Sequence, residues 1–432
     1  MRELQTIILA AGKGTRMKSE LPKVLHPVGG RPLIHYVFDL AQGTGAKKIY
    51  LVLGHGHKKI QQALNKNPRL RIVLQRRLLG TADAVKAAAG SLKQYNGDVL
   101  ILSGDAILLK KETLKSLLQK HRKREAACTF LTTVIQDPRG YGRIIRGFGG
   151  KAVAIREEKD ATEHEKNIME VNAGVYCFQA PVLFKLIHDI KINPKKKEYY
   201  LTDIIALAAQ QKQRIETLEA EDPAEGLGIN TREDLARAQS VVRRRILREL
   251  MLNGVTITDP ATTYVAQGAK IGRDTVINPF VVIESNVRVG AGCRIGPFAR
   301  LRSGTWIADN VELGNFVEVS RTRIGARSLM KHFSFLGDAR LGRKVNIGAG
   351  AVTANYDGKN KNVTHIGDEA FIGSDSILVA PVNVGAKAIT GAGCVVTRGH
   401  SVPAGGVVVG VPARRVNAKK STPRRVRKKK KT

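Results

Sequence analysis

The chain has 432 residues, of which 43% are hydrophobic, and a formal net charge of +35. This length predicts at least two domains. There is no run of about 18 apolar residues and no charged-then-apolar leader, which excludes a predicted membrane-spanning helix and a secretory signal. The four cysteines form no C-x-x-C pair, so we expect no disulfide framework, no thiolate metal site and a reduced, cytoplasmic location; they are Cys128, Cys177, Cys293 and Cys394.

The positive charge is densest in the terminal run 424–431, which contains almost no apolar residues. This composition predicts a disordered basic arm over residues 414–432. Such an arm can bind nucleic acid or an anionic surface, or nothing. Because further basic clusters occur at 195–197 and 243–245, the charge favours anionic small substrates, or a generally basic proteome, over one dedicated nucleic-acid face.

A glycine-rich turn follows the apolar run 6–9, which predicts a buried strand. Turns of this kind leave backbone N–H groups free to bind phosphate. We expect Gly12 and Gly14 to adopt backbone conformations that a Cβ forbids, and Lys13, Arg16 and Lys23 add cations beside them. The spacing matches neither the G-x-G-x-x-G of dinucleotide folds nor the ending of a P-loop, so neither NAD nor a P-loop NTPase is favoured.

Apolar runs alternate with amphipathic segments up to residue 230, which predicts an α/β domain with a mostly parallel, Rossmann-like sheet. In such sheets ligands bind at the carboxyl ends of the strands. The expected strands after the first are Ile49–Leu53, Ile72–Leu74, Val99–Leu102, Cys128–Val134 and Gly174–Phe178.

Polar clusters follow several of these strands. Gln75, with the turn 79–82, offers an amide and backbone groups for a base edge. Asp105 follows a strand directly, and its carboxylate and the amide oxygen of Asn230 suit Mg²⁺. The segment 140–143, with Glu157 and Asn172, offers the hydrogen-bonding groups that a sugar site needs.

The second half repeats a six-residue pattern. After a predicted helical linker over 231–253, which starts like a capping box, aliphatic residues recur every six residues from Ile271 to Leu313. The register slips at Ile324 and Leu341 and resumes at Ile366. A fixed short period predicts a solenoid over 254–413, a parallel β-helix with three hexads per coil. The polar segment 354–361 interrupts the hexads, so we expect a functional loop there.

The order of these motifs resembles one family, the bifunctional N-acetylglucosamine-1-phosphate uridylyltransferases/glucosamine-1-phosphate N-acetyltransferases. The similarity runs from residue 3 to about 412 and rests on L-A-A-G-x-G-T-R-M, L-P-K, Gln75 with L-G-T, G-D, G-Y-G-R, E-Y-Y-L-T-D and I-N-T-R. It implies a nucleotidyltransferase domain over 1–230 and a left-handed β-helix that forms homotrimers. It also implies two reactions: acetyl transfer from acetyl-CoA to glucosamine 1-phosphate, and uridylyl transfer from UTP to N-acetylglucosamine 1-phosphate.

The resemblance implies roles for individual residues. Those implied to bind the uridine nucleotide are Leu9, Ala10, Gly12, Lys23, Gln75, Gly80 and Thr81; those for the sugar are Gly142, Glu157 and Asn172; those for Mg²⁺ are Asp105 and Asn230. We expect Lys23 and Arg16 to hold the phosphates in line during catalysis. In the second half His332 is the implied general base; Arg302, Asn346, Tyr356 and Lys361 are implied to bind the amino-sugar phosphate, and Asn355, Ser374 and Ala392 to lie near acetyl-CoA.

The chain departs from the family at several of these places. Asp83 stands where histidine is usual, and Ala106-Ile107 follows Asp105 where Val-Pro is usual. Ser320 replaces a phosphate-binding lysine and Phe335 a tyrosine, losing charge-assisted bonds worth about 1.5–3 kcal/mol each. Arg321 is the expected substitute for the lysine. An arginine near the acetyl-CoA site is replaced by Gly410.

Three alternatives remain: the first rests on Ser320 and Phe335, the second on the shared glycine-rich turn, and the third on the basic arm. The chain is a sugar-1-phosphate nucleotidylyltransferase, using UTP or dTTP, whose β-helix is structural or acts on another acceptor. It is a thymidylyl- rather than a uridylyltransferase. Or it is a nucleic-acid-associated protein that acts through its basic arm, which predicts salt-sensitive DNA binding without turnover.

Overall fold

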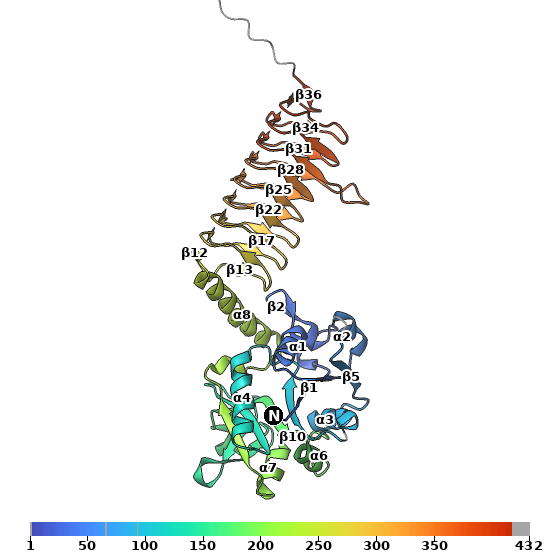
Figure 1. Ribbon diagram of the computed structural model, residues 1–432, viewed down its shortest axis with the longest axis vertical. Coiled ribbons are helices and arrows are strands. Elements are labelled where there is room, and N and C mark those ends of the chain that lie inside the picture. Colours follow the sequence, from blue (N-terminus) through green and yellow to red (C-terminus); the bar gives the residue numbers. More distant parts are fainter. Residues whose placement is uncertain (1, 65–66, 93, 417–432) are drawn as a thin grey trace, which may run out of the picture. The chain divides into compact units, whose positions relative to one another are not determined.

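The computed structural model describes residues 2–64, 67–92 and 94–416 (Figure 1). The chain divides between Val242 and Arg243 into two compact units. Arg414 and Arg415 form a strand, so the prediction of a disordered arm from 414 is wrong for these two residues. Most of that arm, from 417 onward, lies outside the described residues.

The first unit is built on one mixed sheet with the strand order β11-β7-β10-β6-β1-β4-β5. Neighbours pair in parallel, except that β10 is antiparallel to both β6 and β7. The mostly parallel sheet and its expected strands are therefore confirmed, with small shifts at the ends. The strands are β1 (Leu4–Ala10), β4 (Ile49–Leu53), β5 (Leu70–Leu74), β6 (Asp98–Ser103), β7 (Cys128–Val134), β10 (Glu170–Gln179) and β11 (Ile215–Glu219).

Shorter elements complete this unit. The antiparallel pair β8 (Arg143–Arg146) and β9 (Ala152–Arg156) extends the sheet from β10, and β2 (Pro27–Val28) pairs with β3 (Arg31–Pro32). The α-helices are α1 (Leu33–Gly43), α2 (His57–Ala63), α3 (Thr81–Ala89), α4 (Lys111–Lys123), α5 (Glu163–Lys166), α6 (Ala180–Leu186) and α7 (Asp203–Gln210). Single 3-10 turns are η1 (Thr15–Met17), η2 (Lys23–Leu25), η3 (Gly90–Leu92), η4 (Phe148–Gly150) and η5 (Pro223–Gly226).

The core of the first unit forms where helices pack on the sheet. The central strands β4 and β6 are buried along almost their whole length, as expected for strands covered on both faces. Small side chains of α3, such as Ala82 and Ala88, lie in the same apolar cluster as Ile7 and Val52 of the sheet, which lets helix and sheet approach closely.

Helix α8 (Arg232–Leu252) spans the division between the units. Its start is a reciprocal cap: the Thr231 hydroxyl accepts from the Asp234 N–H at 3.1 Å, and an Asp234 carboxylate oxygen accepts from the Thr231 N–H at 2.8 Å. This confirms the predicted capping motif. Gly254, with φ +88°, follows its end, as expected for a helix C-terminus. No helix of the described residues is long and apolar enough to cross a membrane.

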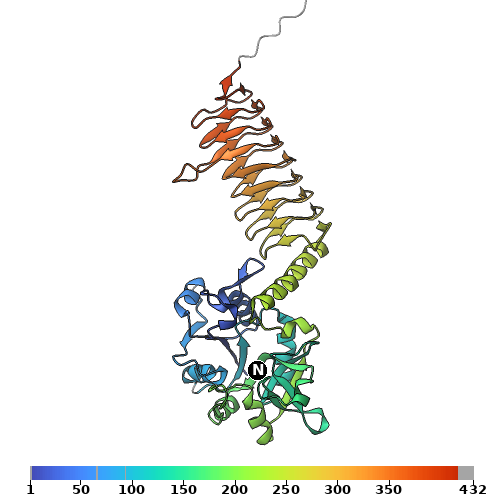
Figure 2. The ribbon, with the colours of Figure 1, turned by 180° about the vertical axis from the view of Figure 1, so that it is seen from behind.

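The second unit is a parallel β-helix with three sheets of short strands (Figures 1 and 2). Sheet one contains β12 (Thr256–Ile257), β15 (Val276–Ile277), β18 (Arg294–Ile295), β21 (Glu312–Leu313), β24 (Leu329–Met330), β27 (Asn346–Ile347), β30 (Phe371–Ile372), β33 (Ile389–Thr390), β35 (Val407–Val409) and the antiparallel β36 (Arg414–Arg415). Sheet two contains β13 (Tyr264–Val265), β16 (Val282–Ile283), β19 (Arg300–Leu301), β22 (Val317–Ser320), β25 (Ser334–Gly337), β28 (Val352–Ala354), β31 (Ile377–Val379) and β34 (Val395–Val396). Sheet three contains β14 (Lys270–Ile271), β17 (Arg288–Val289), β20 (Trp306–Ile307), β23 (Arg323–Ile324), β26 (Ala339–Leu341), β29 (Thr364–Ile366) and β32 (Val382–Val384).

The strand register explains the two slips in the hexad pattern. Regular coils contain 18 residues, so Val276 pairs with Arg294. Beyond Ile307 the spacing falls to 17, with Trp306 paired to Arg323, because each slip removes one residue. It rises to 25 where Asn346 pairs with Phe371, because the segment 354–361 loops out. The predicted solenoid and its interruption are confirmed.

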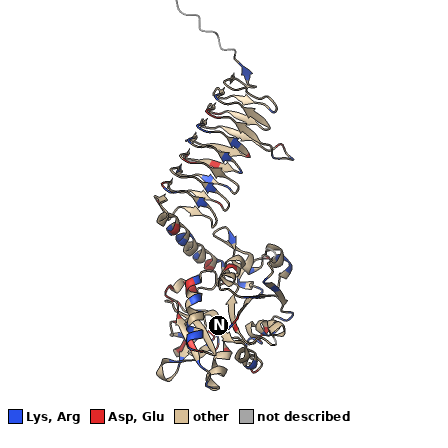
Figure 3. Cartoon of the chain, viewed as in Figure 1, with Lys and Arg blue, Asp and Glu red and all other residues tan. Residues whose placement is uncertain are grey.

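Inward aliphatic residues fill the β-helix, and one corner carries an external aromatic stack. The rings of Phe280, Phe298 and Phe316 lie on successive coils, with centroids 4.8 and 5.1 Å apart. All three residues have positive φ, and the stacking of their rings adds favourable contacts between the coils. Figure 3 shows Lys and Arg on α8 and along the β-helix, as the diffuse charge in the sequence predicts. The four cysteines are free and buried.

Candidate active sites

A cleft of about 750 Å³ opens in the first unit where β1, β5 and β6 end. Since these strands are close neighbours in the sheet, the segments that follow them meet at one edge. The cleft collects every predicted site residue of this unit except Gly142: Leu9, Ala10, Gly12, Arg16, Lys23, Gln75, Gly80, Thr81, Asp105, Glu157, Asn172 and Asn230.

The glycine-rich turn forms one wall of this cleft. Gly14 has φ +63°, and a Cβ there would lie 2.8 Å from the Cβ of Lys23, so glycine is required. Gly12 differs from the prediction: its φ is not positive, and a Cβ would meet no atom within 4 Å. The lack of a side chain at Gly12 therefore leaves space in the cleft instead of permitting an unusual backbone.

Two oxygens predicted to bind metal converge on one cation. The Lys23 ammonium donates to Oδ2 of Asp105 at 2.5 Å and to Oδ1 of Asn230 at 3.3 Å. Ser103 donates to the other carboxylate oxygen of Asp105 at 2.5 Å. Burial raises the pKa of Asp105, but the charge and hydrogen bond of Lys23 and the bond from Ser103 outweigh it, so this pKa lies below its ordinary value.

This donor set fits a hard divalent cation. A carboxylate and an amide oxygen aimed at the same positive centre are ligands that Mg²⁺ accepts. No cluster of three or more His, Cys, Asp or Glu able to hold a metal occurs in the described part of the chain. A cation at Asp105 and Asn230 would therefore take its remaining ligands from water and from substrate phosphates.

The base side of the cleft is formed by Gln75 and the start of α3. Gln75 is buried, and its amide nitrogen donates to the Gly80 carbonyl at 3.1 Å and to Asp83 at 2.7 Å. Gly80 has φ +101°, with Tyr199 backbone atoms where a Cβ would stand. The Thr81 hydroxyl accepts from the Leu201 N–H at 2.9 Å, which fixes this turn against the segment 198–203.

Glu157 and Asn172 lie on the predicted sugar side. A register shift in β10 between Asn172 and Tyr176 lets the Asn172 amide donate to the Tyr176 hydroxyl at 2.6 Å. The Glu157 carboxylate accepts from Thr202 at 2.8 Å, and burial, with nearby acidic groups, raises its pKa above the ordinary value. Gly142 does not line the cleft: its carbonyl accepts from the Asn172 N–H at 2.9 Å, behind that residue.

Sequence reasoning did not predict the contacts that support these groups, although Tyr141 lies in the segment 140–143 that it assigned to the sugar site. Ser103 and Thr202 bind the carboxylates of Asp105 and Glu157, respectively. The Tyr141 hydroxyl accepts from the Gly228 N–H at 3.2 Å, next to Asn230. Ser103 directly follows the predicted strand Val99–Leu102 and ends the observed strand β6, so its position was a usable signal. The contacts of Thr202 and Tyr141 join segments distant in sequence.

In the second unit the predicted residues lie on two different corners. His332 is exposed in the turn from sheet one to sheet two. The registers place Ser374 and Ala392 in the same turn of later coils. We call this edge the His332 corner. Asn346 lies on β27, on the sheet-one side of it.

The other corner joins sheet two to sheet three and carries Arg302, Asn355, Tyr356 and Lys361. Tyr356 and Lys361 pair across the neck of the loop, and Tyr356 is 61% exposed. One face of the β-helix, roughly 15 Å wide for about five extended residues, separates these residues from His332. A single chain therefore does not bring His332 beside these residues.

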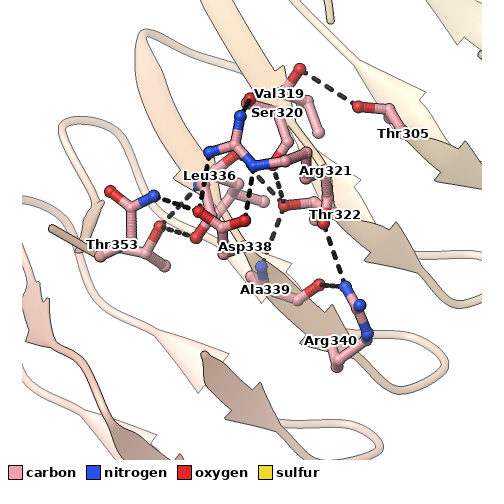
Figure 4. Close-up of polar contacts among 12 residues, drawn as sticks. Thr305, Val319, Ser320, Arg321, Thr322, Leu336, Asp338, Ala339, Arg340 and Thr353 are labelled. Atoms are coloured by element: carbon pink, nitrogen blue, oxygen red, sulfur yellow. Dashed lines mark hydrogen bonds and ion pairs between the residues drawn. The ribbon is translucent and has the colours of Figure 1, made fainter. Parts of the chain in front are cut away.

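Arg321 occupies this second corner but is already paired (Figure 4). Its guanidinium donates to both carboxylate oxygens of Asp338 at 2.6 and 2.8 Å, and to the Ser320 hydroxyl at 2.9 Å. Asp338 also accepts from the Asn355 amide at 2.5 Å. The expected replacement of the missing lysine by Arg321 is therefore weakened, because a neutralised guanidinium attracts phosphate less than a free cation does.

Comparisons with known proteins agree with both units. The nucleotidyl transferase family model matches residues 5–224, the bacterial transferase hexapeptide model matches 268–303 and 286–321, and the hexapeptide repeat of succinyl-transferase matches 363–398. Curated proteins of similar sequence, each named bifunctional protein GlmU, include those of Pelobacter propionicus (43% identity, 95% of this chain and 96% of the relative), Geobacter sulfurreducens (41%, 95% and 96%) and Carboxydothermus hydrogenoformans (42%, 91% and 95%). A nucleotidyltransferase unit followed by a hexapeptide β-helix, matched at this identity over nearly the full length, shows that the chain belongs to the family of bifunctional GlmU proteins.

Proposed function

We propose that the chain makes UDP-N-acetylglucosamine in two reactions. The β-helix transfers the acetyl group of acetyl-CoA to glucosamine 1-phosphate. The first unit then transfers a uridylyl group from UTP to N-acetylglucosamine 1-phosphate and releases pyrophosphate. The observation that carries the proposal is the single cleft in which the glycine-rich turn, Gln75 and the convergent oxygens of Asp105 and Asn230 meet.

In the uridylyl reaction a phosphate oxygen of the sugar 1-phosphate attacks the α-phosphorus of UTP. No side-chain nucleophile is needed, because the attacking group is already anionic. The protein has to hold two polyanions in line, which backbone N–H groups of the turn, Lys23 and Arg16 do by charge and hydrogen bonding. Glu157 and Asn172 orient the sugar by its hydroxyl and acetamido groups.

Asp105 and Asn230 hold Mg²⁺ in this proposal. A divalent cation held there would neutralise negative charge on the phosphates. Lys23 contacts both ligands, so it would be free to bind the phosphates if a cation took its place. Ser103 keeps the Asp105 carboxylate oriented through this exchange.

In the acetyl reaction His332 accepts a proton from the 2-amino group of the sugar as its nitrogen attacks the thioester carbon, and CoA thiolate leaves. His332 is exposed and lies apart from Arg302, Tyr356 and Lys361. We therefore propose that the enzyme is a homotrimer in which one chain's His332 corner meets the other corner of a neighbouring chain. We also propose that it acts in the cytoplasm, with any contact of the basic arm to nucleic acid or anionic surfaces not required for turnover.

The test separates the two reactions. The purified chain is assayed with UTP, Mg²⁺ and N-acetylglucosamine 1-phosphate, and separately with acetyl-CoA and glucosamine 1-phosphate. Asp105→Asn should abolish only uridylyl transfer and His332→Ala only acetyl transfer. If both activities fall together in a folded variant, the two-site proposal is wrong. If the wild-type chain does not acetylate glucosamine 1-phosphate, the β-helix acts on another acceptor or serves assembly alone.

A further inference from the structure

The orientation of the Gln75 amide is dictated by its two neighbours. Its nitrogen lies 3.1 Å from the carbonyl oxygen of Gly80 and 2.7 Å from a carboxylate oxygen of Asp83. A carbonyl and an ionised carboxylate can only accept hydrogen bonds. The NH₂ group must therefore face both of them, and the opposite orientation would place three acceptors together.

This arrangement leaves Gln75 with one free function. Both amide hydrogens of Gln75 are used, so a ligand can bind only to its Oε1. This oxygen accepts no hydrogen bond from the described residues. It also does not belong to the completely buried side-chain atoms that lack a partner. The Gly80 N–H, at the start of α3, donates to none of the described groups either. The wall of the cleft thus presents an acceptor on Gln75 and a donor on Gly80.

We propose that Asp83 is a specificity-determining positioning residue that makes the cleft select a pyrimidine with a protonated N3. The inference rests on the proposed uridylyl transfer and extends it. Asp83 does not line the cleft, so it acts through Gln75 and touches no substrate. It lies in the first turn of α3, where the helix dipole favours its negative charge.

The chemistry distinguishes uracil from cytosine. Uracil and thymine carry an N3–H between two carbonyl oxygens, which complements an acceptor flanked by an N–H donor. Cytosine has a bare N3 acceptor, which would face Gln75 Oε1 without a shared hydrogen. Its exocyclic amine is a donor one position farther along the edge, so cytosine has to shift in the cleft to use it.

The experiment measures the ratio of kcat/KM for UTP to that for CTP, together with equilibrium binding of both nucleotides by calorimetry. Asp83→Ala removes the nearer of the two acceptors that hold the Gln75 amide and leaves only the Gly80 carbonyl. It should reduce the UTP:CTP ratio about tenfold, through weaker UTP and stronger CTP binding. Asp83→Asn keeps an oxygen that can accept from Gln75 and should retain most of the preference. Lys86→Ala is the matched control, since Lys86 is on the same helix but contacts the Tyr199 ring.

Three results would overturn the inference: a wild-type chain that does not prefer UTP to CTP, an unchanged ratio in folded Asp83→Ala, or an equal loss in Asp83→Asn. dTTP should behave like UTP at this contact, because thymine has the same N3–H. A chain that turns over no nucleotide would refute the proposed function instead. The binding comparison of UTP with CTP would then decide the role of Asp83 by itself.

Discussion

Replacing Lys23 by glutamine should tighten the binding of a divalent cation while it impairs catalysis. The Lys23 ammonium donates to both oxygens that we assign to the metal. A divalent cation has to displace this ammonium. Glutamine removes the competing positive charge and leaves Asp105, Asn230 and the Ser103 hydrogen bond in place.

The size of the effect follows from the bond that must break. A charge-assisted hydrogen bond in a partly buried site contributes about 1.5–3 kcal/mol, which corresponds to roughly 10- to 150-fold in a dissociation constant. The displaced ammonium regains water, so we expect the lower end, about tenfold tighter binding in Lys23→Gln. Uridylyl transfer should nevertheless fall, because Lys23 is then missing from the phosphates.

Titration of Mn²⁺ into the nucleotide-free protein by calorimetry or electron paramagnetic resonance measures this affinity directly. Lys13→Gln is the matched control, since Lys13 lines the same cleft and its removal changes the local charge without touching Asp105. If Lys23→Gln and Lys13→Gln change the Mn²⁺ affinity equally, only the overall charge matters. If Lys23→Gln binds Mn²⁺ no better than the wild type, the competition that we describe does not exist.

Three further predictions concern other parts of the molecule. Phe298→Ala removes the middle ring of the aromatic stack and should destabilise the β-helix by about 1–3 kcal/mol. Phe371 is similarly exposed, and Phe371→Ala should reduce the free energy of unfolding less. Thermal unfolding followed by circular dichroism compares the two variants. Glu157 has a raised pKa in the folded state, so its ionisation opposes folding at pH values above its unfolded pKa of about 4.5. Glu157→Gln should therefore raise Tm at pH 7 and lose this gain as the pH falls to 4. An equal gain in Tm at pH 7 and pH 4 would contradict this origin. Ser320→Lys should lower the KM for glucosamine 1-phosphate about tenfold by restoring a cation. Arg321→Ala should change this KM less, because Asp338 already neutralises Arg321. A larger effect of Arg321→Ala would show that the guanidinium leaves Asp338 to bind phosphate.

The sequence was most informative where one periodicity determines the structure. The hexads predicted the β-helix, and the slips at Ile324 and Leu341 predicted where its coils shorten. The same slips imply a 17-residue spacing, which stacks Arg321 directly below Asp338 in the next coil. That ion pair was therefore within reach of sequence reasoning, but only if the shortened register was followed from strand to corner.

The first cleft could be predicted for a topological reason. Parallel strands place the segments after β1, β5 and β6 at one edge, so residues far apart in sequence, such as Lys23 and Asp105, were expected together. The strand pattern did not predict which hydrogen bonds each of these side chains makes. The contact of Lys23 with both metal ligands, and of Asp83 with Gln75, depends on side-chain geometry that strand order does not determine.

For the predicted site in the β-helix, the sequence pattern was less informative about how the site residues come together. The strand order puts His332 and Lys361 on different corners. The hexads alone do not place Lys361, because the segment 354–361 interrupts them. In the proposed homotrimer, the residues that recognise the acceptor and the residue that accepts its proton come from different copies. Mixing His332→Ala chains with Lys361→Ala chains should then restore acetyl transfer in part, since a mixed trimer contains at least one intact pair of corners. Failure of every such mixture to recover activity, with exchange of chains demonstrated, would mean that one chain completes the site by a rearrangement of the loop 354–361.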